Sequence, residues 1–289
     1  MDMKPMLAEP ADPKMLPTFI ADPNLGFEQK VDGHRVMIVV DGGVVKILNR
    51  SGKPKANAIP LSIVSMFAGM AGGPWVFDGE LVSDLHGSTL WLFDMPRALD
   101  KVLPSHPYEF RRQIMMSIIP ALNAGSSVQP LPVFWEEDEK ARIALHLLRR
   151  GAEGVMVKRL SAPYQPGARN TDCRKVKYRY DIDCVAGDPK TGLLNRDGKD
   201  NIVLWVFDEN GDPFEVGVCT ALAGDGSKVT VGDVVTVNYL YATDDRRLYQ
   251  PTLPRIRDDK ARVECKVDQL VFCDKTIVTA ADLAAEIAA

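Results

Sequence analysis

One stretch near the start of the chain combines a lysine, an aspartate and an arginine within six residues. Residues 30–35 read Lys-Val-Asp-Gly-His-Arg. In an extended strand alternate side chains share a face, so we expect Glu28, Lys30 and Asp32 to line one surface before Gly33 lets the chain turn. A lysine on a buried strand is costly unless it is paired or functional. The stretch therefore indicates either a Lys30–Asp32 ion pair at a hairpin edge or an amine with a function.

Two further lysines lie two residues apart, at Lys175 and Lys177. If this segment is a strand, both side chains point to the same side and both can contact one phosphate group. The alternative is an exposed basic strand edge that discourages aggregation.

Two carboxylates stand next to glycines, since Glu80 follows Gly79 and Glu153 precedes Gly154. Glu153 also opens a predicted strand, which is a suitable position for a magnesium ligand, directly or through water. The alternative for each is a solvated carboxylate at a strand end.

Positive charge is concentrated in one part of an acidic chain. The 289 residues carry a formal net charge of −4. Residues 140–180 contain eleven Lys or Arg and two acids, whereas residues 181–289 contain twelve basic and twenty acidic side chains. Such a basic segment can bind phosphate while the rest of the chain stays soluble.

The composition excludes several classes of protein. Hydrophobic residues make up 46% and charged residues 26%, which is typical of a folded soluble protein. No run of some 18 apolar residues predicts a membrane span, and the first residues lack the apolar core of a signal peptide. Five cysteines without a C-x-x-C pair argue against a disulfide scaffold or a zinc site. We therefore expect a cytoplasmic protein without a membrane partner.

Strand-like and helical segments are interleaved up to residue 180. Two strands joined at Asp41-Gly42-Gly43 are predicted within residues 26–50. Other strands are predicted at 74–82, 88–96, 132–135 and 154–160, and helices at 58–72, 108–125 and 136–151. The pattern predicts an α/β (α+β) domain with antiparallel sheets and helices over residues 1–180.

Short strands follow one another beyond residue 181. They are predicted at 181–188, 201–208, 214–222 and 233–242, and a capped short helix follows at 279–289. This spacing is typical of a small antiparallel barrel of the five-stranded oligonucleotide-binding (OB-fold) kind, over residues 181–289.

Seven motifs in a fixed order resemble those of the covalent nucleotidyltransferases, and most closely the ATP-dependent DNA ligases of compact viral and bacterial type. The K-x-D-G-x-R signature of that superfamily stands here as KVDGHR. The other six segments that carry the resemblance are NRSGK (49–53), FDGEL (77–81), LWLFDMP (90–96), EGVMVK (153–158), RKVKY (174–178) and PRIRDDK (254–260).

The resemblance implies that Lys30 forms a covalent bond to a nucleotide. Such a bond requires an uncharged amine, which neighbouring cations and partial desolvation favour. By resemblance, Lys175 and Lys177 supply these cations, Asp32 positions the lysine or the metal, and Glu153 binds the metal. The implied cofactors are ATP and Mg²⁺.

The resemblance also assigns roles around the rest of the nucleotide and the DNA. Phe93 stacks on the purine, Glu28 contacts the adenine amino group, and Arg35 and Glu80 flank the ribose. Arg257, Asp259 and Lys260 orient the departing pyrophosphate after closure of the C-terminal domain. Arg50 grips the 5′ phosphate of a nick, and Lys53 adds to the DNA contact.

The implied function is ATP-dependent sealing of nicks in duplex DNA, in replication, repair or recombination. We expect a monomer in the cytoplasm of a bacterium or of a phage-infected host cell. Two alternatives remain open: an RNA ligase or mRNA capping guanylyltransferase, which share the K-x-D-G-x-R and K-x-K motifs, and a catalytically silent nick-binding protein.

Overall fold

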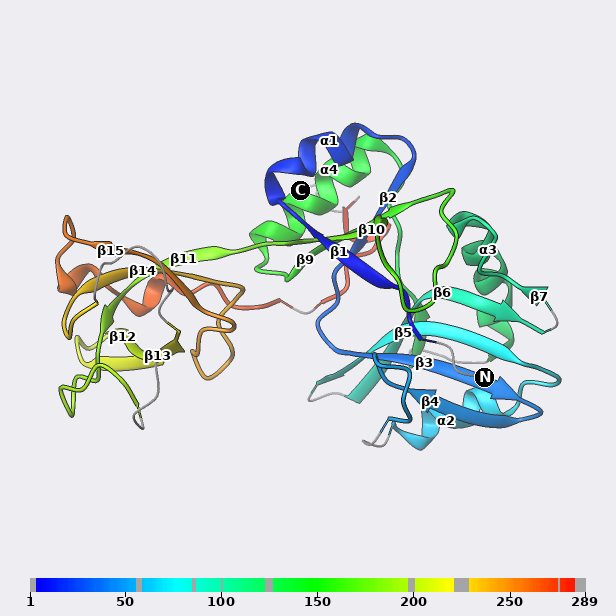
Figure 1. Ribbon diagram of the computed structural model, residues 1–289, viewed down its shortest axis with the longest axis horizontal. Helices are drawn as coiled ribbons and strands as arrows, with labels where there is room; N and C mark the ends of the chain where they lie inside the picture. Colours follow the sequence, from blue (N-terminus) through cyan, green and yellow to red (C-terminus); the bar gives the residue numbers. More distant parts are fainter. Residues whose placement is uncertain are drawn as a thin grey trace. The chain divides into compact units, whose positions relative to one another are not determined.

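The chain forms two compact units, each with its own sheets (Figure 1). The computed structural model describes residues 4–55, 59–84, 87–99, 101–122, 127–196, 201–220, 229–274 and 276–283. The first unit comprises Met1–Leu147, Gly154–Lys177 and Lys275–Ala289, and the second unit comprises Leu148–Glu153 and Tyr178–Asp274. Where the sequence predicted one boundary, between residues 180 and 181, the chain passes between the units four times.

Two sheets build the first unit. The six-stranded sheet has the order β4-β3-β5-β6-β7, and β8 pairs with β6. Its strands are β3 (His34–Asp41), β4 (Val44–Leu48), β5 (Trp75–Asp84), β6 (Gly87–Ala98), β7 (Lys101–Val102) and β8 (Val128–Pro130). The four-stranded sheet consists, in order, of β1 (Leu7–Ala11), β10 (Arg169–Lys177), β9 (Gly154–Arg159) and β2 (Leu25–Gln29). These sheets confirm the mixed α and β architecture predicted for this part of the chain. The prediction that they are antiparallel is wrong for two pairs, since β1 pairs with β10 and β8 pairs with β6 in parallel.

Four helices accompany these sheets. They are α1 (Leu16–Ala21), α2 (Leu61–Ala68), α3 (Tyr108–Ile118) and α4 (Glu137–Arg149). Ile63 and Phe67 of α2 join Phe77 of β5 in the core of the six-stranded sheet, where the Phe67 and Phe77 rings meet edge to face at 5.3 Å. The helix predicted to start at residue 108 turns into a 3-10 turn, Ile119–Leu122, around Pro120, and residues 123–126 lie outside the described residues.

The segment around Lys30 departs from the predicted hairpin. Strand β2 ends at Gln29 and β3 starts at His34, and the two strands belong to different sheets. The prediction that Glu28, Lys30 and Asp32 line one strand face is therefore wrong. Gly33 lies so close to β5 that a Cβ atom would come within 2.5 Å of the Leu81 carbonyl oxygen, which explains the glycine at this crossing between sheets.

The strand predicted at residues 132–135 is reduced to one isolated bridge, between Phe27 and Phe134. Pro132 lacks a backbone N–H and cannot donate to a strand ladder, so the segment does not continue as a strand.

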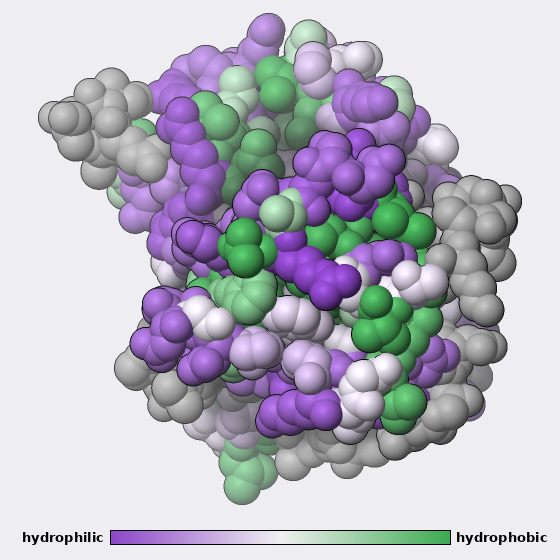
Figure 2. All heavy atoms as spheres, turned by 90° about the vertical axis from the view of Figure 1, so that its left-hand side faces the viewer, coloured by the Kyte–Doolittle hydropathy of each residue, from purple (hydrophilic) through white to green (hydrophobic). Residues whose placement is uncertain are grey.

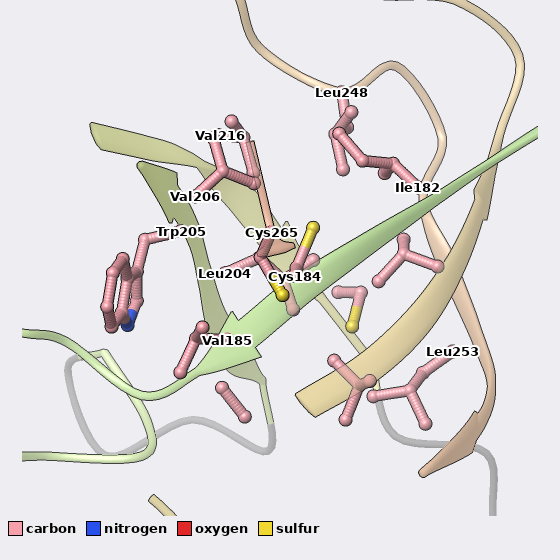
Figure 3. Close-up of a cluster of buried hydrophobic side chains, with 14 of the residues drawn as sticks. Ile182, Cys184, Val185, Leu204, Trp205, Val206, Val216, Leu248, Leu253 and Cys265 are labelled. Carbon is pink, nitrogen blue, oxygen red and sulfur yellow. The ribbon is translucent and has the colours of Figure 1, made fainter. Parts of the chain in front are cut away.

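The second unit contains one antiparallel sheet with the order β13-β12-β11-β14-β15. Its strands are β11 (Tyr180–Ala186), β12 (Ile202–Phe207), β13 (Pro213–Cys219), β14 (Val234–Tyr239) and β15 (Thr252–Arg257). Two 3-10 turns follow, Arg262–Glu264 and Val267–Gln269. Ile182, Leu204 and Val216 lie in its buried core, drawn in Figure 3. Within the described residues the strand order is an open path with β13 and β15 at its edges, and the closed barrel stays a prediction.

Polar side chains cover much of the side of the molecule seen in Figure 2, with hydrophobic groups scattered among them. In the part of the chain that the structure describes, none of the helices has the length and apolar character that crossing a bilayer requires.

The Asp183 carboxylate of β11 connects β14, β15 and the segment after β15 in the second unit. Asp183 accepts hydrogen bonds from Thr236 of β14 at 2.7 Å, from Lys260 at 2.6 Å and from Arg257 of β15 at 3.3 Å. Burial raises the pKa of Asp183. The hydrogen bonds from Lys260 and Thr236 lower it by more than burial raises it, so the net pKa lies below its ordinary value. The ionised carboxylate therefore stabilises this unit.

Replacing Phe67 by alanine should lower the free energy of unfolding by about 3–5 kcal/mol, because the ring is fully buried and its loss leaves a cavity. Chemical denaturation followed by circular dichroism measures the change. Leu61→Ala is the matched control in the same helix, since Leu61 is 81% exposed; a loss there as large as that of Phe67→Ala would contradict the packing described.

Replacing Asp183 by asparagine should destabilise the second unit at pH 7 and matter less in acid. Folding lowers the pKa of this carboxylate. Asp183 therefore stabilises the folded protein fully at pH values above the pKa of 3.8 in the unfolded chain, and this contribution is lost as the pH falls through the lower pKa of the folded protein. Urea unfolding at pH 7 and at about pH 3 measures the free energy of unfolding of both proteins. The difference between Asp183→Asn and the unmodified protein should be smaller at the acidic pH. Asp268→Asn, at an exposed position, serves as the control. If the free energies of unfolding of Asp183→Asn and of the unmodified protein differ equally at both pH values, the stabilising role of the Asp183 ion pairs is contradicted.

Candidate functional site

Lys30 lies next to Gly154, the first residue of β9, where the neighbouring strand β10 ends at Lys177. Its backbone N–H donates to the carbonyl oxygen of Gly154 at 2.8 Å, and Lys177 pairs with the same glycine in the β9–β10 ladder. Gly154 has a φ of +144°, and a Cβ atom there would come within 2.0 Å of the Val176 carbonyl oxygen. The main chains of three predicted motifs therefore meet at a position that only glycine can fill.

Positive charges gather around Lys175 of β10. Burial lowers the pKa of Lys175, and the charges of Lys177, Arg169, Arg50 and Lys30 lower it further. Like charges have this effect only when they lie close together. Four of the five cations were predicted site residues, and the structure brings them together from separate motifs.

Arg169, the fifth cation, was not predicted. Its guanidinium donates to the carbonyl oxygen of Ala8 at 2.6 Å, which holds it against β1. Arg169 begins β10, the strand that ends with Lys175 and Lys177. A basic residue six positions before the first lysine was the only signal in the sequence, and spacing alone does not reveal that it joins the cluster.

Two carboxylates that can bind magnesium are close in sequence to Gly154 and Lys30, whose backbones are joined by a hydrogen bond. Glu153 is 6% exposed and directly precedes Gly154, and Asp32 is half-buried two residues after Lys30. Among the described residues no three or more His, Cys, Asp or Glu side chains form a metal cluster. Mg²⁺ commonly uses only one or two carboxylates together with substrate phosphates and water. The oxygen donors of these two residues fit that chemistry, and their metal role stays a prediction.

Arg35 and Glu80 lie opposite each other on β3 and β5. The Arg35 guanidinium donates two hydrogen bonds to Asp78, at 2.9 and 2.6 Å, and Tyr164 donates a third to the same carboxylate at 2.7 Å. Burial lowers the pKa of Arg35, but the Asp78 carboxylate raises it by more. A bidentate ion pair therefore fixes the orientation of Arg35 next to Glu80.

Phe93 of β6 is half-buried and has two cations beside its ring. The Lys158 ammonium lies 4.6 Å from the ring centroid and the Arg35 guanidinium 5.3 Å from it. The neighbouring Asp94 is buried and accepts two hydrogen bonds from Arg111, each 2.8 Å long. The ring is thus held by a rigid strand, as a stacking platform for a base requires.

Glu28 is 1% exposed and its carboxylate already has partners. It accepts a hydrogen bond from the Tyr108 hydroxyl and forms an ion pair with Lys158 at 2.6 Å. Each of the two carboxylate oxygens of Glu28 therefore already has a partner, Tyr108 for one and Lys158 for the other.

Several residues that position this site were not predicted: Asp78, Asp94, Arg111, Tyr108 and Lys158. Asp78 and Asp94 stand inside the apolar segments FDGEL and LWLFDMP. A charge within an apolar strand must be paired when it is buried, so the sequence held a signal for the two aspartates. Arg35, the cation that pairs with Asp78, was a predicted site residue, but the sequence held no signal for Arg111, the partner of Asp94.

Arg50 and Lys53 are exposed on a tight loop after β4. The Asn49 side chain accepts hydrogen bonds from the backbone of Ser51 at 2.9 Å and of Lys53 at 3.2 Å. The loop is therefore shaped by its own polar groups, and the DNA contact of the two cations stays a prediction.

Arg257 and Lys260 are held inside the second unit. Arg257 donates two hydrogen bonds to Asp259, at 2.6 and 2.8 Å, in addition to the contacts of both cations with Asp183 described above. The hydrogen bonds from Arg257 are the main cause that lowers the pKa of Asp259 to about 2. The three residues of the predicted end motif thus form one charged group with Asp183.

The chain is similar in sequence to DNA ligases. Residues 84–177 match the family described as ATP dependent DNA ligase domain. A probable DNA ligase from Rhodococcus jostii is 27% identical over 241 residues, which cover 74% of this chain and 46% of that protein. The multifunctional non-homologous end joining protein LigD of Mycobacterium bovis is 26% identical over 214 residues, covering 68% of this chain and 27% of that protein. The chain thus spans about half the length, or less, of these relatives.

Solved ligase structures share its fold. The ligase domain of LigD from M. tuberculosis matches with a TM-score of 0.53 and 22% identity, covering 91% of this chain and 97% of that one. A Lig E DNA ligase matches with a TM-score of 0.62 and 17% identity, covering 88% and 99%. Together with the seven ordered motifs and the matched domain, these similarities make the chain similar to ATP-dependent DNA ligases in sequence and in fold.

Proposed function

We propose that this protein is an ATP-dependent DNA ligase that seals nicks in duplex DNA, acting as a monomer. The observation that carries the proposal is the group of cations Lys30, Arg50, Arg169 and Lys177, whose charges act on Lys175. Such a concentration of positive charge attracts a polyphosphate. The similarity to LigD adds support, because a mycobacterial DNA ligase D of the same fold was solved in complex with ATP.

The reaction then proceeds in three transfers. The Lys30 amine loses a proton and attacks the α-phosphorus of ATP, so that an N–P bond forms and the bond to pyrophosphate breaks. An oxygen of the 5′ phosphate at a nick next attacks the same phosphorus and releases the lysine. The adjacent 3′ hydroxyl finally attacks the 5′ phosphorus and displaces AMP, which closes the strand.

The surrounding residues hold the nucleotide during the first transfer. Lys175 and Lys177 contact the phosphates, Phe93 stacks on the base, and Arg35 and Glu80 hold the ribose. Glu28 contacts the adenine edge. Glu153 and Asp32 hold Mg²⁺, which when bound neutralises negative charge on the phosphates.

Contacts with DNA come from Arg50, Lys53 and the basic segment 140–180, since phosphate neutralisation dominates nucleic-acid affinity. We also propose that the second unit is an OB-fold barrel. A parallel bridge joins Thr220, next to β13, with Thr252 of β15, and these are the two edge strands that closure must bring together.

Lys30→Ala should abolish the covalent adduct with AMP, because it removes the amine that attacks the α-phosphorus. Incubation with α-labelled ATP and Mg²⁺, followed by denaturing electrophoresis, measures adduct formation. Lys190→Ala, which removes an exposed lysine of the second unit, should label normally. Labelling of Lys30→Ala, or labelling of the unmodified protein from GTP but not from ATP, would contradict the proposal.

Arg257→Ala and Lys260→Ala should each lose self-adenylylation and still seal a nick that already carries AMP. The two cations serve the departing pyrophosphate, which takes no part in the last transfer. Gel assays with ATP and with pre-adenylylated nicked DNA separate the two steps. Arg246→Ala is the control in the same unit, and equal loss of both steps in the Arg257 and Lys260 variants would refute their role.

A further inference from the structure

The last described segment of the chain, Thr276–Leu283, packs into the first unit although it follows the whole of the second. Val278 is 1% exposed and Leu283 4% exposed, so their side chains are buried like core residues. This segment belongs to none of the seven motifs, and nothing in the proposed reaction uses it.

The segment is ordered by its own hydrogen bonds. The Thr279 backbone N–H and hydroxyl both donate to Asp282, each at 2.7 Å, and the Asp282 N–H donates back to the Thr279 hydroxyl at 3.3 Å. This reciprocal cap starts a helical turn at Ala280. The segment therefore presents a fixed backbone to its neighbours.

Gln29 is the residue that receives this backbone. Its side-chain amide donates to the Thr276 carbonyl oxygen at 3.1 Å and accepts from the Val278 N–H at 3.0 Å. Gln29 is 3% exposed, and its bond with Val278 is buried whereas its bond with Thr276 is partly buried. A buried amide with both ends satisfied holds its own backbone firmly in place.

We propose that Gln29, held by Thr276–Val278, is a positioning residue for the adjacent Lys30. The backbone around Lys30 is fixed on one side by the bond from its N–H to Gly154 and by the pairing of Gln29 with Val155 of β9. The Gln29 side chain adds a third attachment, directly before the nucleophile. This inference rests on the proposed function, because it gives Lys30 an orientation that matters only if Lys30 attacks ATP.

Gln29→Met tests the proposal, because methionine keeps the length of the side chain and removes both hydrogen bonds. Misplacing a reacting group by about 1 Å can cost a factor of about 100. We expect adenylylation at saturating ATP to slow by about 10-fold to 100-fold, with an unchanged KM for ATP. Sealing of pre-adenylylated nicks should keep its rate, because the Lys30 amine is not the nucleophile in that step.

Two further variants sharpen the experiment. Gln113→Met makes the same chemical change at an exposed site on α3 and should leave all rates unchanged. A chain ending at Asp274 removes the segment that holds Gln29 and should reproduce the Gln29→Met pattern. A normal adenylylation rate in Gln29→Met, or an equal loss of adenylylation and of sealing, would overturn the positioning role.

Hydrogen exchange gives a readout independent of activity. The peptide covering residues 25–33 should exchange faster in Gln29→Met and in the shortened chain than in the unmodified protein. Unaltered exchange overturns the proposal even when the unmodified protein is active. A lack of any lysyl–AMP adduct in the unmodified protein refutes the proposed ligase function instead, so the two failures are distinguishable.

Discussion

Electrostatic repulsion among the cations gathered around Lys175 is the constraint on which the site depends. Burial acts against the charge of Lys175, and the charges of Lys177, Arg169, Arg50 and Lys30 add to this effect. Such an arrangement costs free energy in the folded protein, so something must hold the cations together. The four-stranded sheet does so: Arg169, Lys175 and Lys177 share β10, whose ladder with β9 ends at the glycine that also binds the Lys30 backbone. A bound polyphosphate relieves this repulsion, so the same cost becomes a preference for an anionic ligand.

Buried ion pairs deal with the remaining charges in a different way. Arg35 with Asp78, Arg111 with Asp94 and Lys158 with Glu28 each place a cation against a carboxylate inside the first unit. Breaking such a pair would leave an uncompensated buried charge, so these pairs lock the strands that carry them. The cations around Lys175 repel one another, whereas Arg35, Arg111 and Lys158 are neutralised by carboxylates.

The sequence predicted the parts of the molecule that follow from local pattern. Apolar periodicity predicted the strands of FDGEL and LWLFDMP, the helix at Glu137–Arg149 and the mixed architecture. The ordered motifs indicated the resemblance to DNA ligases.

The sequence did not predict that Lys30 lies between two sheets, because a K-x-D-G stretch next to apolar residues looks like a continuous strand. Gly33 was predicted as a turn, but its close approach to Leu81 depends on β5, which is about fifty residues away in sequence. The partners of Asp78, Asp94 and Glu28 were beyond local pattern for the same reason, since Tyr164, Arg111 and Lys158 reach them only through the fold. The roles of the individual site residues stay predictions that the geometry supports without testing.

The route of the chain has a consequence for biosynthesis. Gln29 leaves the ribosome long before its hydrogen-bond partners Thr276 and Val278, which emerge only after most of the second unit has been made. Folding during translation generally proceeds from the N-terminus. The strand that leads to Lys30 must therefore wait, incompletely bonded, while almost 250 residues are added. A nascent or prematurely terminated chain could form both sheets of the first unit and still lack the final bonds beside its nucleophile.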